Sequence, residues 1–247
     1  MKIVILGDIH GRTEWKKIIE KESPDLTVFL GDYVSTHELI SPEQQWENML
    51  EILELPNATR LRGNHDVQHL GYYWAECSEF DQYIYERMSK PEFVEEFLSK
   101  TQWLQCFDTG DKTYICSHAG ISQTWFDNMK RQGQLLYDLD KNPTSEHVLH
   151  FINDCEPDEN FGFTPDSSFD YSGTSKCQPL TWIRPQTLCK DMLEGYGQIV
   201  GHTPVKTITN AKEACKNKLD LWLCDRMPQE YLYIKNGNFY IGDSRML

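Results

Sequence analysis

The sequence predicts an α/β fold for its 247 residues, and three observations support that prediction. Short apolar runs alternate with segments of helical periodicity, as in proteins that wrap helices around sheets. Several of the apolar runs are followed at once by Gly or Ser together with Asp, Asn or His. Towards the end of the chain, two alternating segments flank an Asn-Gly pair, which is typical of a hairpin.

The first predicted strand covers residues 2–6 and ends at Gly7-Asp8-Ile9-His10-Gly11. Thr13 follows it at a position where a hydroxyl side chain can cap a helix. We therefore expect a helix over residues 14–21, which stops before Pro24.

A second buried strand is expected over residues 26–30, and it ends at Gly31-Asp32-Tyr33. The next helix begins at Ser41, because Pro42 and Glu43 follow it as a helix start requires. Its apolar residues recur at helical spacing and predict a face that packs in the core: Trp46, Met49, Leu50 and Leu53.

Three further apolar runs lead into polar segments. Residues 59–61 run into Arg62-Gly63-Asn64-His65-Asp66, residues 114–116 into Ser117-His118-Ala119-Gly120, and residues 199–200 into Gly201-His202-Thr203-Pro204. Each run predicts a short strand. The intervening residues 67–105 are expected to be largely helical.

The chain is expected to form a single domain over residues 1–247. Within it, residues 205–247 predict C-terminal strands and a hairpin, with Asn236-Gly237 as the turn. Residues 142–175 contain no Lys or Arg and seven acids, which predicts a long irregular acidic loop. This loop is expected to be a solvated surface segment, with a lid over the site as the alternative.

The charge balance excludes some classes of function. The chain has 24 Lys and Arg against 38 Asp and Glu, a net charge of −14, which argues against a general binder of nucleic acids or anionic membranes. No segment is apolar enough for a signal peptide or a membrane span. The eight cysteines are scattered singly without a Cys-x-x-Cys pair, so we expect reduced thiols and a cytoplasmic protein.

The polar residues that follow the strands predict one site, because ligands gather at the carboxyl ends of strands in α/β folds. Carboxylates, imidazoles and an amide without a thiolate favour divalent ions such as Mn²⁺, Fe, Zn²⁺ or Co²⁺. A carboxylate shared by two ions would give the chemistry of phosphoester hydrolysis. The residues concerned are Asp8, His10, Asp32, Asn64, His65, Asp66, His118 and His202.

The five polar segments, in this order over residues 7–204, resemble the five motif blocks of the calcineurin-like metallophosphoesterase superfamily. The closest form is the phosphoprotein phosphatase (Ser/Thr phosphatase) branch, with its small bacterial and phage members. The resemblance implies a four-layer α/β/β/α sandwich with two mixed sheets.

The resemblance also implies two divalent metal ions, with Mn²⁺ as the first expectation and Fe, Zn²⁺, Co²⁺ or Ni²⁺ as alternatives. By that resemblance, one ion is held by Asp8, His10 and Asp32. The other is held by Asp32, Asn64, His118 and His202, so that Asp32 bridges the pair.

For catalysis, the resemblance implies a metal-bridging hydroxide as nucleophile and His65 as the general acid. Asp66 resembles the partner that orients His65, and a carboxylate there would raise the pKa of the imidazole. Arg62 and Asn64 are expected to contact the substrate phosphate, Arg62 through its planar fork of donors.

The sequence departs from the branch at Ser35-Thr36-His37, where its protein phosphatases usually have Asp-Arg-Gly. The usual phosphate clamp is therefore altered. The segment Thr181-Trp182-Ile183-Arg184-Pro185 resembles a Trp-x-Arg segment of bacterial relatives, and Arg184 could replace the clamp. A surface or packing role for Arg184 is equally open.

These observations predict a phosphomonoesterase that acts on a phosphoprotein or a small phosphoester. A dinucleoside polyphosphate or nucleotide hydrolase, or a phosphodiesterase, is the alternative with the same site. A non-catalytic scaffold is the third hypothesis, and the complete ligand set argues against it. The remaining histidines are expected to be ordinary surface or core residues: His37, His69, His147 and His150. The physiological substrate, the native metals and the oligomeric state stay open.

Overall fold

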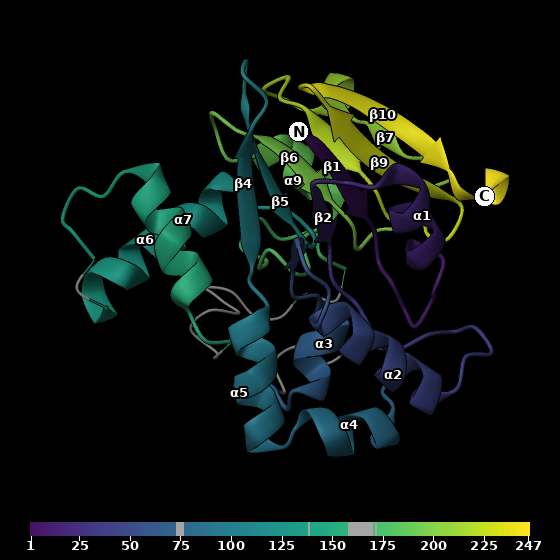
Figure 1. The fold of residues 1–247 in the computed structure, drawn as a ribbon. Coiled ribbons are helices and arrows are strands. Elements are labelled where there is room, and N and C mark those ends of the chain that lie inside the picture. The colour runs from purple at the N-terminus through teal and green to yellow at the C-terminus, as the bar shows by residue number, and fades with distance from the viewer. Residues whose placement is uncertain (73–76, 138, 158–169, 171) are drawn as a thin grey trace.

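Two mixed five-stranded sheets form the centre of the computed structural model, which describes residues 1–72, 77–137, 139–157, 170 and 172–247 (Figure 1). The first sheet has the order β10-β9-β1-β2-β3. Its strands are β1 (Lys2–Leu6), β2 (Leu26–Phe29), β3 (Ala58–Arg60), β9 (Glu230–Lys235) and β10 (Asn238–Asp243). The first three are parallel, and the hairpin β9–β10 joins β1 antiparallel.

The second sheet has the order β4-β5-β6-β8-β7. Its strands are β4 (Leu104–Asp108), β5 (Thr113–Ser117), β6 (Gly197–Val200), β7 (Thr209–Asn210) and β8 (Leu221–Leu223). Strands β5, β6 and β8 are parallel, and β4 and β7 run antiparallel at the two edges.

The alternation of side chains along β1 shows how the layers are built. Ile3 and Ile5 lie in the core between the two sheets, together with residues of the second sheet such as Ile199. Val4 and Leu6 point to the opposite face and pack against helices. Because successive side chains of a strand point to opposite faces, a strand buried on both sides must be apolar throughout.

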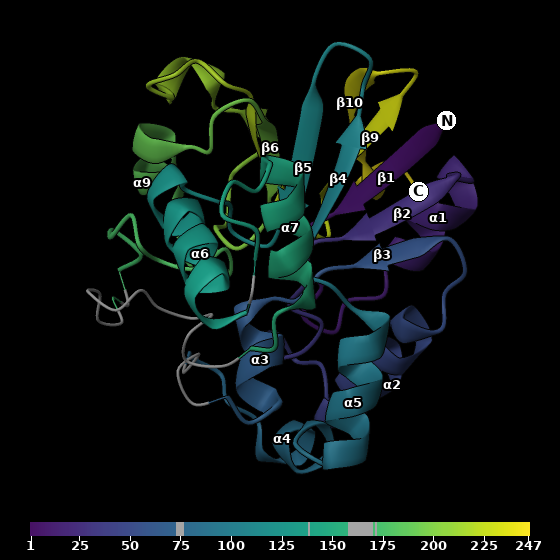
Figure 2. The ribbon, with the colours of Figure 1, turned by 90° about the vertical axis from the view of Figure 1, so that its left-hand side faces the viewer.

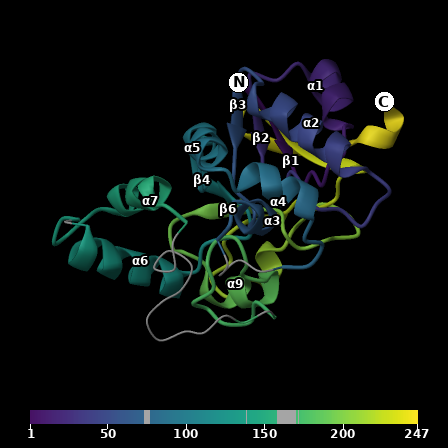
Figure 3. The ribbon, with the colours of Figure 1, turned by 90° about the horizontal axis from the view of Figure 1, so that it is seen from below.

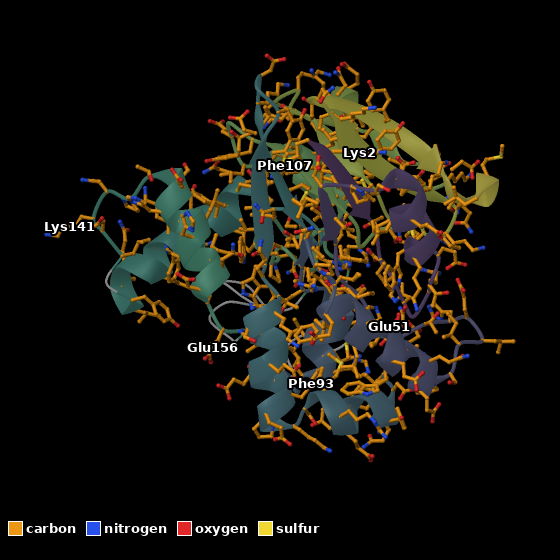
Figure 4. All side chains as sticks on the ribbon, viewed as in Figure 1. Lys2, Glu51, Phe93, Phe107, Lys141 and Glu156 are labelled. Carbon is orange, nitrogen blue, oxygen red and sulfur yellow. The ribbon has the colours of Figure 1, made fainter. Side chains whose placement is uncertain are left out.

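Helices α1 (Trp15–Glu22) and α2 (Pro42–Leu53) share one apolar cluster with the first sheet, and this cluster continues into α4 (Gln82–Met88) and α5 (Pro91–Lys100), which lie below the sheets (Figure 1). Phe93 of α5 lies among these helices (Figure 4). A capping box between Ser41 and Gln44 starts α2 as expected, and Met49 packs in the core. The expected Thr13 cap of α1 is wrong, because Glu14 is the N-cap residue and makes no side-chain cap bond.

The helices α6 (Gln123–Leu136), α7 (Ser145–Asp154) and α9 (Pro185–Asp191) pack on the second sheet. Helices α6 and α7 lie side by side (Figure 3), and Lys141 marks the far end of their connection (Figure 4). The expected four-layer α/β/β/α sandwich is therefore confirmed.

Helix α7 corrects part of the loop expected over residues 142–175. Thr144 caps the helix, and Val148, Leu149 and Ile152 are buried against the second sheet. In the sequence, the many acidic residues of this segment made the apolar face of the helix hard to recognise. Residues 158–169 and 171, the rest of the expected lid, lie outside the described residues.

The carboxyl ends of β1, β2, β3, β5, β6 and β8 meet at one edge of the double sheet. The short helix α3 (Asn64–His69) follows β3 there and lies beneath the two sheets (Figure 2). The remaining described helices are the 3-10 turns Lys212–Ala214 and Ser244–Met246. Among the described residues, no helix has the length and apolar character that a membrane span needs.

Candidate metal centre and active site

The loops at this edge bring the six expected metal ligands together. Five of them are buried and His10 is half-buried, and all except His118 line a cavity of about 610 Å³. Their ligand atoms form two compact groups, in each of which all atoms lie within 4.8 Å of one another. One group is Asp8, His10 and Asp32, the other is Asp32, His118 and His202, and Asp32 belongs to both.

Two glycines of the motifs are needed because the carboxylates lie directly against them. A Cβ on Gly63 would come within 2.0 Å of Asp32 Oδ1, and a Cβ on Gly201 within 2.3 Å of Asp8 Oδ1. Any side chain at these positions would displace a ligand. Gly63, which precedes Asn64, therefore leaves room for Asp32, and Gly201, which precedes His202, leaves room for Asp8.

Three of the ligands adopt the left-handed backbone conformation that residues other than glycine rarely accept. The φ angles are 47° for His10, 51° for Asp32 and 62° for His202. Such strain costs on the order of 1 kcal/mol or more at each residue, and it concentrates at functional sites. The surrounding fold holds these three side chains where the site needs them.

The contacts of His118 test whether a cation fits. His118 Nδ1 donates to the carbonyl of Leu30 at 2.7 Å, so Nε2 carries the lone pair when the ring is neutral. That atom lies 2.9 Å from Asn64 Oδ1 and 3.4 Å from Asp32 Oδ2. Two donors at right angles on an octahedral ion, each about 2.1 Å from it, are about 3 Å apart. The spacing therefore fits three ligands of one metal ion.

The contacts of His202 and His10 also agree with a bound cation. His202 Nε2 is buried and has no hydrogen-bond partner among the described residues, as expected for an atom that faces a cation. Burial, with help from His118 and Arg184, holds the pKa of His202 well below its usual range, so the ring is neutral. His10 Nδ1 donates to the Val34 carbonyl at 3.1 Å, which leaves Nε2 about 4 Å from the carboxylates of Asp8 and Asp32.

The charges at the site also call for a cation. Burial and Asp32 raise the pKa of Asp8 to about 7, although the His202 backbone N–H donates to this carboxylate at 2.9 Å. Burial also opposes ionisation of Asp32, but His118 and His65 more than offset it and lower the pKa of Asp32. Likewise, Asp32 and Asp8 outweigh burial at His118 and raise its pKa to about 10. A proton on His118 thus supplies the positive charge that the carboxylates attract.

His65 lies in the first turn of α3 and lines the cavity. Its ring meets that of His10 edge to face, with centroids 5.3 Å apart. Burial is the main cause that lowers the pKa of His65 to about 4, against the opposing charge of Asp32. His65 Nδ1 is buried without a hydrogen-bond partner among the described residues.

Asp66 does not orient His65, which corrects the expectation for this pair. Its carboxylate accepts three backbone N–H groups instead, from Asp32 at 2.9 Å, Tyr33 at 2.8 Å and Gly63 at 2.8 Å. Consecutive residues of a helix point in different directions, so the two side chains face different neighbours. Asp66 therefore fixes the loop that carries the shared ligand Asp32.

Arg62 is not placed as a phosphate contact, and its expected role is corrected in the same way. The guanidinium is buried and donates to the carbonyls of Leu98 and Thr101, at 2.8 Å and 2.7 Å, and to Thr101 Oγ1 at 2.9 Å. It also lies over the ring of Trp103. A guanidinium satisfies the free carbonyls at the end of a helix well, here those of α5. Arg62 is not among the residues that line the cavity.

Arg184 is the N-cap residue of α9 and lines the cavity. Its Nη1 donates to the carbonyl of His202 at 3.2 Å and to Thr203 Oγ1 at 3.1 Å. No described residue accepts a hydrogen bond from its Nε or Nη2. The structure thus positions one cationic side chain beside the ligands with donor groups to spare.

Sequence reasoning missed several residues that line the cavity. Arg12 lies there in an ion pair with Glu38, and Glu79 lies there 3.2 Å from His37. Asp225, which follows β8, is a buried carboxylate in the same cavity, and burial and Asp8 raise its pKa to about 8. The sequence signal for Asp225 is an apolar run followed by an acid, the same pattern that predicted the other site residues. Strand β8 is too short for this run to be recognised in the sequence.

The other histidines agree with the expectation of ordinary roles where the structure describes their contacts. His69 Nδ1 donates to the His65 carbonyl at 2.7 Å, and its Nε2 accepts the Asp81 N–H at 3.0 Å. His69 is fully buried and supports the loop beyond α3.

Several solved structures have a fold similar to that of this chain. A cold-active protein tyrosine phosphatase has a TM-score of 0.56 and 16% identity, with 98% of this chain and 76% of that chain covered. A protein serine/threonine phosphatase from Saccharomyces cerevisiae has a TM-score of 0.52 and 13% identity, covering 98% and 79%. A hypothetical protein from Pyrococcus horikoshii OT3 has a TM-score of 0.51 and 12% identity, covering 98% and 87%.

No curated protein matches the sequence. The family model of the calcineurin-like phosphoesterases matches residues 1–224, which include all six expected ligands. The chain therefore belongs to the calcineurin-like phosphoesterase family, and it is a metal-dependent phosphoester hydrolase.

Proposed function

We propose that the protein is a phosphomonoesterase with two metal ions, which resembles protein Ser/Thr phosphatases in its chemistry. The observation that carries the proposal is the pair of ligand groups that share Asp32, a residue that lines the same cavity as His65. Asp8, His10 and Asp32 hold one ion. The ligands of the other are Asp32, Asn64, His118 and His202.

When bound, the two ions supply a hydroxide nucleophile near neutral pH and neutralise the oxygens of the phosphoryl group. Mn²⁺ is our first choice, because the set mixes carboxylate, amide and imidazole donors. The buried, unpartnered Nε2 of His202 and the close approach of His118 to Asn64 support this use of the site.

In this proposal, His65 protonates the leaving oxygen. The low pKa of the buried ring keeps His65 neutral before the substrate arrives. A phosphate dianion in the cavity places a negative charge near the His65 ring. This charge stabilises the protonated imidazole and raises its pKa towards the neutral range, where an acid catalyst works. His65 thus becomes an acid when the substrate is in place.

Arg184 provides the cationic contact for the substrate phosphate. It lines the cavity, and its Nε and Nη2 have no acceptor among the described residues, whereas Arg62 is directed to the end of α5. Arg12 is a weaker candidate, since Glu38 already neutralises it. Asn64 is proposed as a ligand of the second ion, and it also lines the cavity that would hold the substrate phosphate.

The test is hydrolysis of p-nitrophenyl phosphate with and without Mn²⁺, by the wild type and His65→Asn. We expect Mn²⁺-dependent turnover, and a loss of about 10²–10⁴ in kcat for the variant with unchanged metal content. His37→Asn is the matched control, because it removes another histidine of the cavity that is exposed and paired with Glu79. Full turnover by His65→Asn would remove His65 from the acid role.

The arginine arrangement also supports a second candidate, a nucleotide or dinucleoside polyphosphate hydrolase, or a phosphodiesterase. With Thr36 in the cavity wall, Arg62 turned away and Arg12 paired with Glu38, Arg184 is the one arginine of the cavity without a carboxylate partner among the described residues. Turnover of a phosphopeptide, diadenosine tetraphosphate and bis-p-nitrophenyl phosphate should be compared. A higher kcat/KM on either of the last two would favour this candidate over the monoesterase.

A further inference from the structure

The carboxylate of Asp225 lies next to the first group of metal ligands without belonging to it. Asp225 follows β8, the third parallel strand of the second sheet, and its side chain shares the cavity with Asp8 and His10. Only 8% of the residue is exposed. The expected ligand set contains no residue from the end of this strand.

The backbone holds Asp225 in this place from both sheets. A Cβ on Gly7 would come within 2.4 Å of the Cys224 carbonyl oxygen and 3.1 Å of Asp225 Cα, so the chain at Asp225 touches the residue before Asp8. The Asp225 carbonyl accepts the Val205 N–H at 3.0 Å. Its position is therefore as well defined as that of the ligands.

The carboxylate of Asp225 has no ion-pair partner within 4 Å among the described residues. None of the described residues donates a hydrogen bond to it. The two arginines of the cavity have other partners, since Arg12 pairs with Glu38 and Arg184 donates to the His202 carbonyl. An ionised carboxylate that is buried without a partner is costly, so such a group takes up a proton, pairs with an opposite charge or binds a metal ion.

We propose that Asp225 is an additional acidic residue of the first metal site, beside Asp8, His10 and Asp32. This inference rests on the proposed function, because it assumes that a cation occupies that site. Asp225 lies outside the compact group whose atoms are within 4.8 Å, so it acts on the cation through intervening solvent. It is a positioning residue that strengthens the hold on the cation.

The assignment increases the difference between the two sites. The first site has two carboxylates and one imidazole, Asp8, Asp32 and His10, and Asp225 adds a third negative charge beside them. The second site has a single carboxylate, the shared Asp32, with two imidazoles and an amide. Because oxygen-rich, anionic sites favour hard ions and imidazole-rich sites favour Fe or Zn²⁺, the first site should prefer Mn²⁺ or Mg²⁺ more strongly than the second.

The experiment is a Mn²⁺ titration of the full chain by calorimetry and by electron paramagnetic resonance, with the wild type and Asp225→Asn. We expect two equivalents in both proteins, with the Kd of one equivalent raised about 10–100-fold in the variant. Glu79→Gln is the matched control, because it removes an acid of the same cavity that pairs with His37, and its Kd values should stay within threefold.

A second variant, Asp225→Glu, separates charge from folding, and circular dichroism checks that each variant is folded. It keeps the negative charge and should bind both equivalents within tenfold of the wild type. Equal weakening in Asp225→Glu and Asp225→Asn, or unchanged affinity in Asp225→Asn, would overturn the role of Asp225. A wild type that binds no Mn²⁺ would instead overturn the proposed function itself.

Discussion

The buried contacts of Arg62 predict that its loss destabilises the fold and leaves the chemistry in place. Arg62→Met replaces the guanidinium that lies over the Trp103 ring by an apolar group and removes the donors to Leu98 and Thr101. Two buried carbonyls then lack a partner, at about 1–3 kcal/mol each. For a loss of about 4 kcal/mol in the free energy of unfolding, a domain of this size loses roughly 8–16 °C in Tm.

The assay is thermal unfolding of the metal-free protein, combined with kcat/KM at a temperature where both proteins are folded. Arg184→Met is the matched control, because this arginine lines the cavity. It should change Tm by less than about 3 °C and lower kcat/KM by roughly tenfold or more, as for loss of a charged hydrogen bond. An unchanged Tm in Arg62→Met together with a hundredfold loss of kcat/KM would show that Arg62 does contact the phosphate.

Three further predictions concern the metal centre. Asp32→Asn should lose both equivalents of Mn²⁺, since Asp32 belongs to both ligand groups, and a variant that keeps two equivalents in metal analysis would contradict the shared ligand. Gly201→Ala should weaken the site at Asp8 at least tenfold in a Mn²⁺ titration, because the new Cβ would lie 2.3 Å from Asp8 Oδ1; unchanged binding would show that the carboxylate can move aside. The apparent Mn²⁺ affinity should rise up to tenfold per pH unit between pH 6 and 8, because Asp32 and Asp8 raise the pKa of His118 to about 10 and the ion must displace that proton. Calorimetry in buffers of different ionisation enthalpy measures the proton release, and an affinity independent of pH would refute this assignment.

The part of the site that follows from the sequence is the part encoded locally. Asp8, Asp32 and His118 each come directly after a short apolar strand, and a strand end places the next side chains at the edge of the sheet whatever the rest of the chain does. The same locality explains why β1 and the capped start of α2 were predictable.

The errors concern side chains whose partners lie far away in the sequence. Arg62 donates to carbonyls at the end of α5, more than thirty residues later, and Asp66 accepts N–H groups from the loop after β2. Both residues stand in the expected motif, but only the packed fold decides which neighbour satisfies a buried polar group. Asp225 was missed because the three residues of β8 are too few for a periodic pattern.

The contacts of Asp8 and His118 connect the two sheets of the sandwich at the metal centre. The His202 N–H, from the second sheet, reaches across to Asp8, and the His118 ring bonds the Leu30 carbonyl of the first sheet. Asp8, His10 and Asp32 all follow strands of the first sheet, but the group of Asp32, His118 and His202 needs ligands that follow strands of both sheets. Occupancy of this second group by a metal ion should thus report that the two sheets have docked.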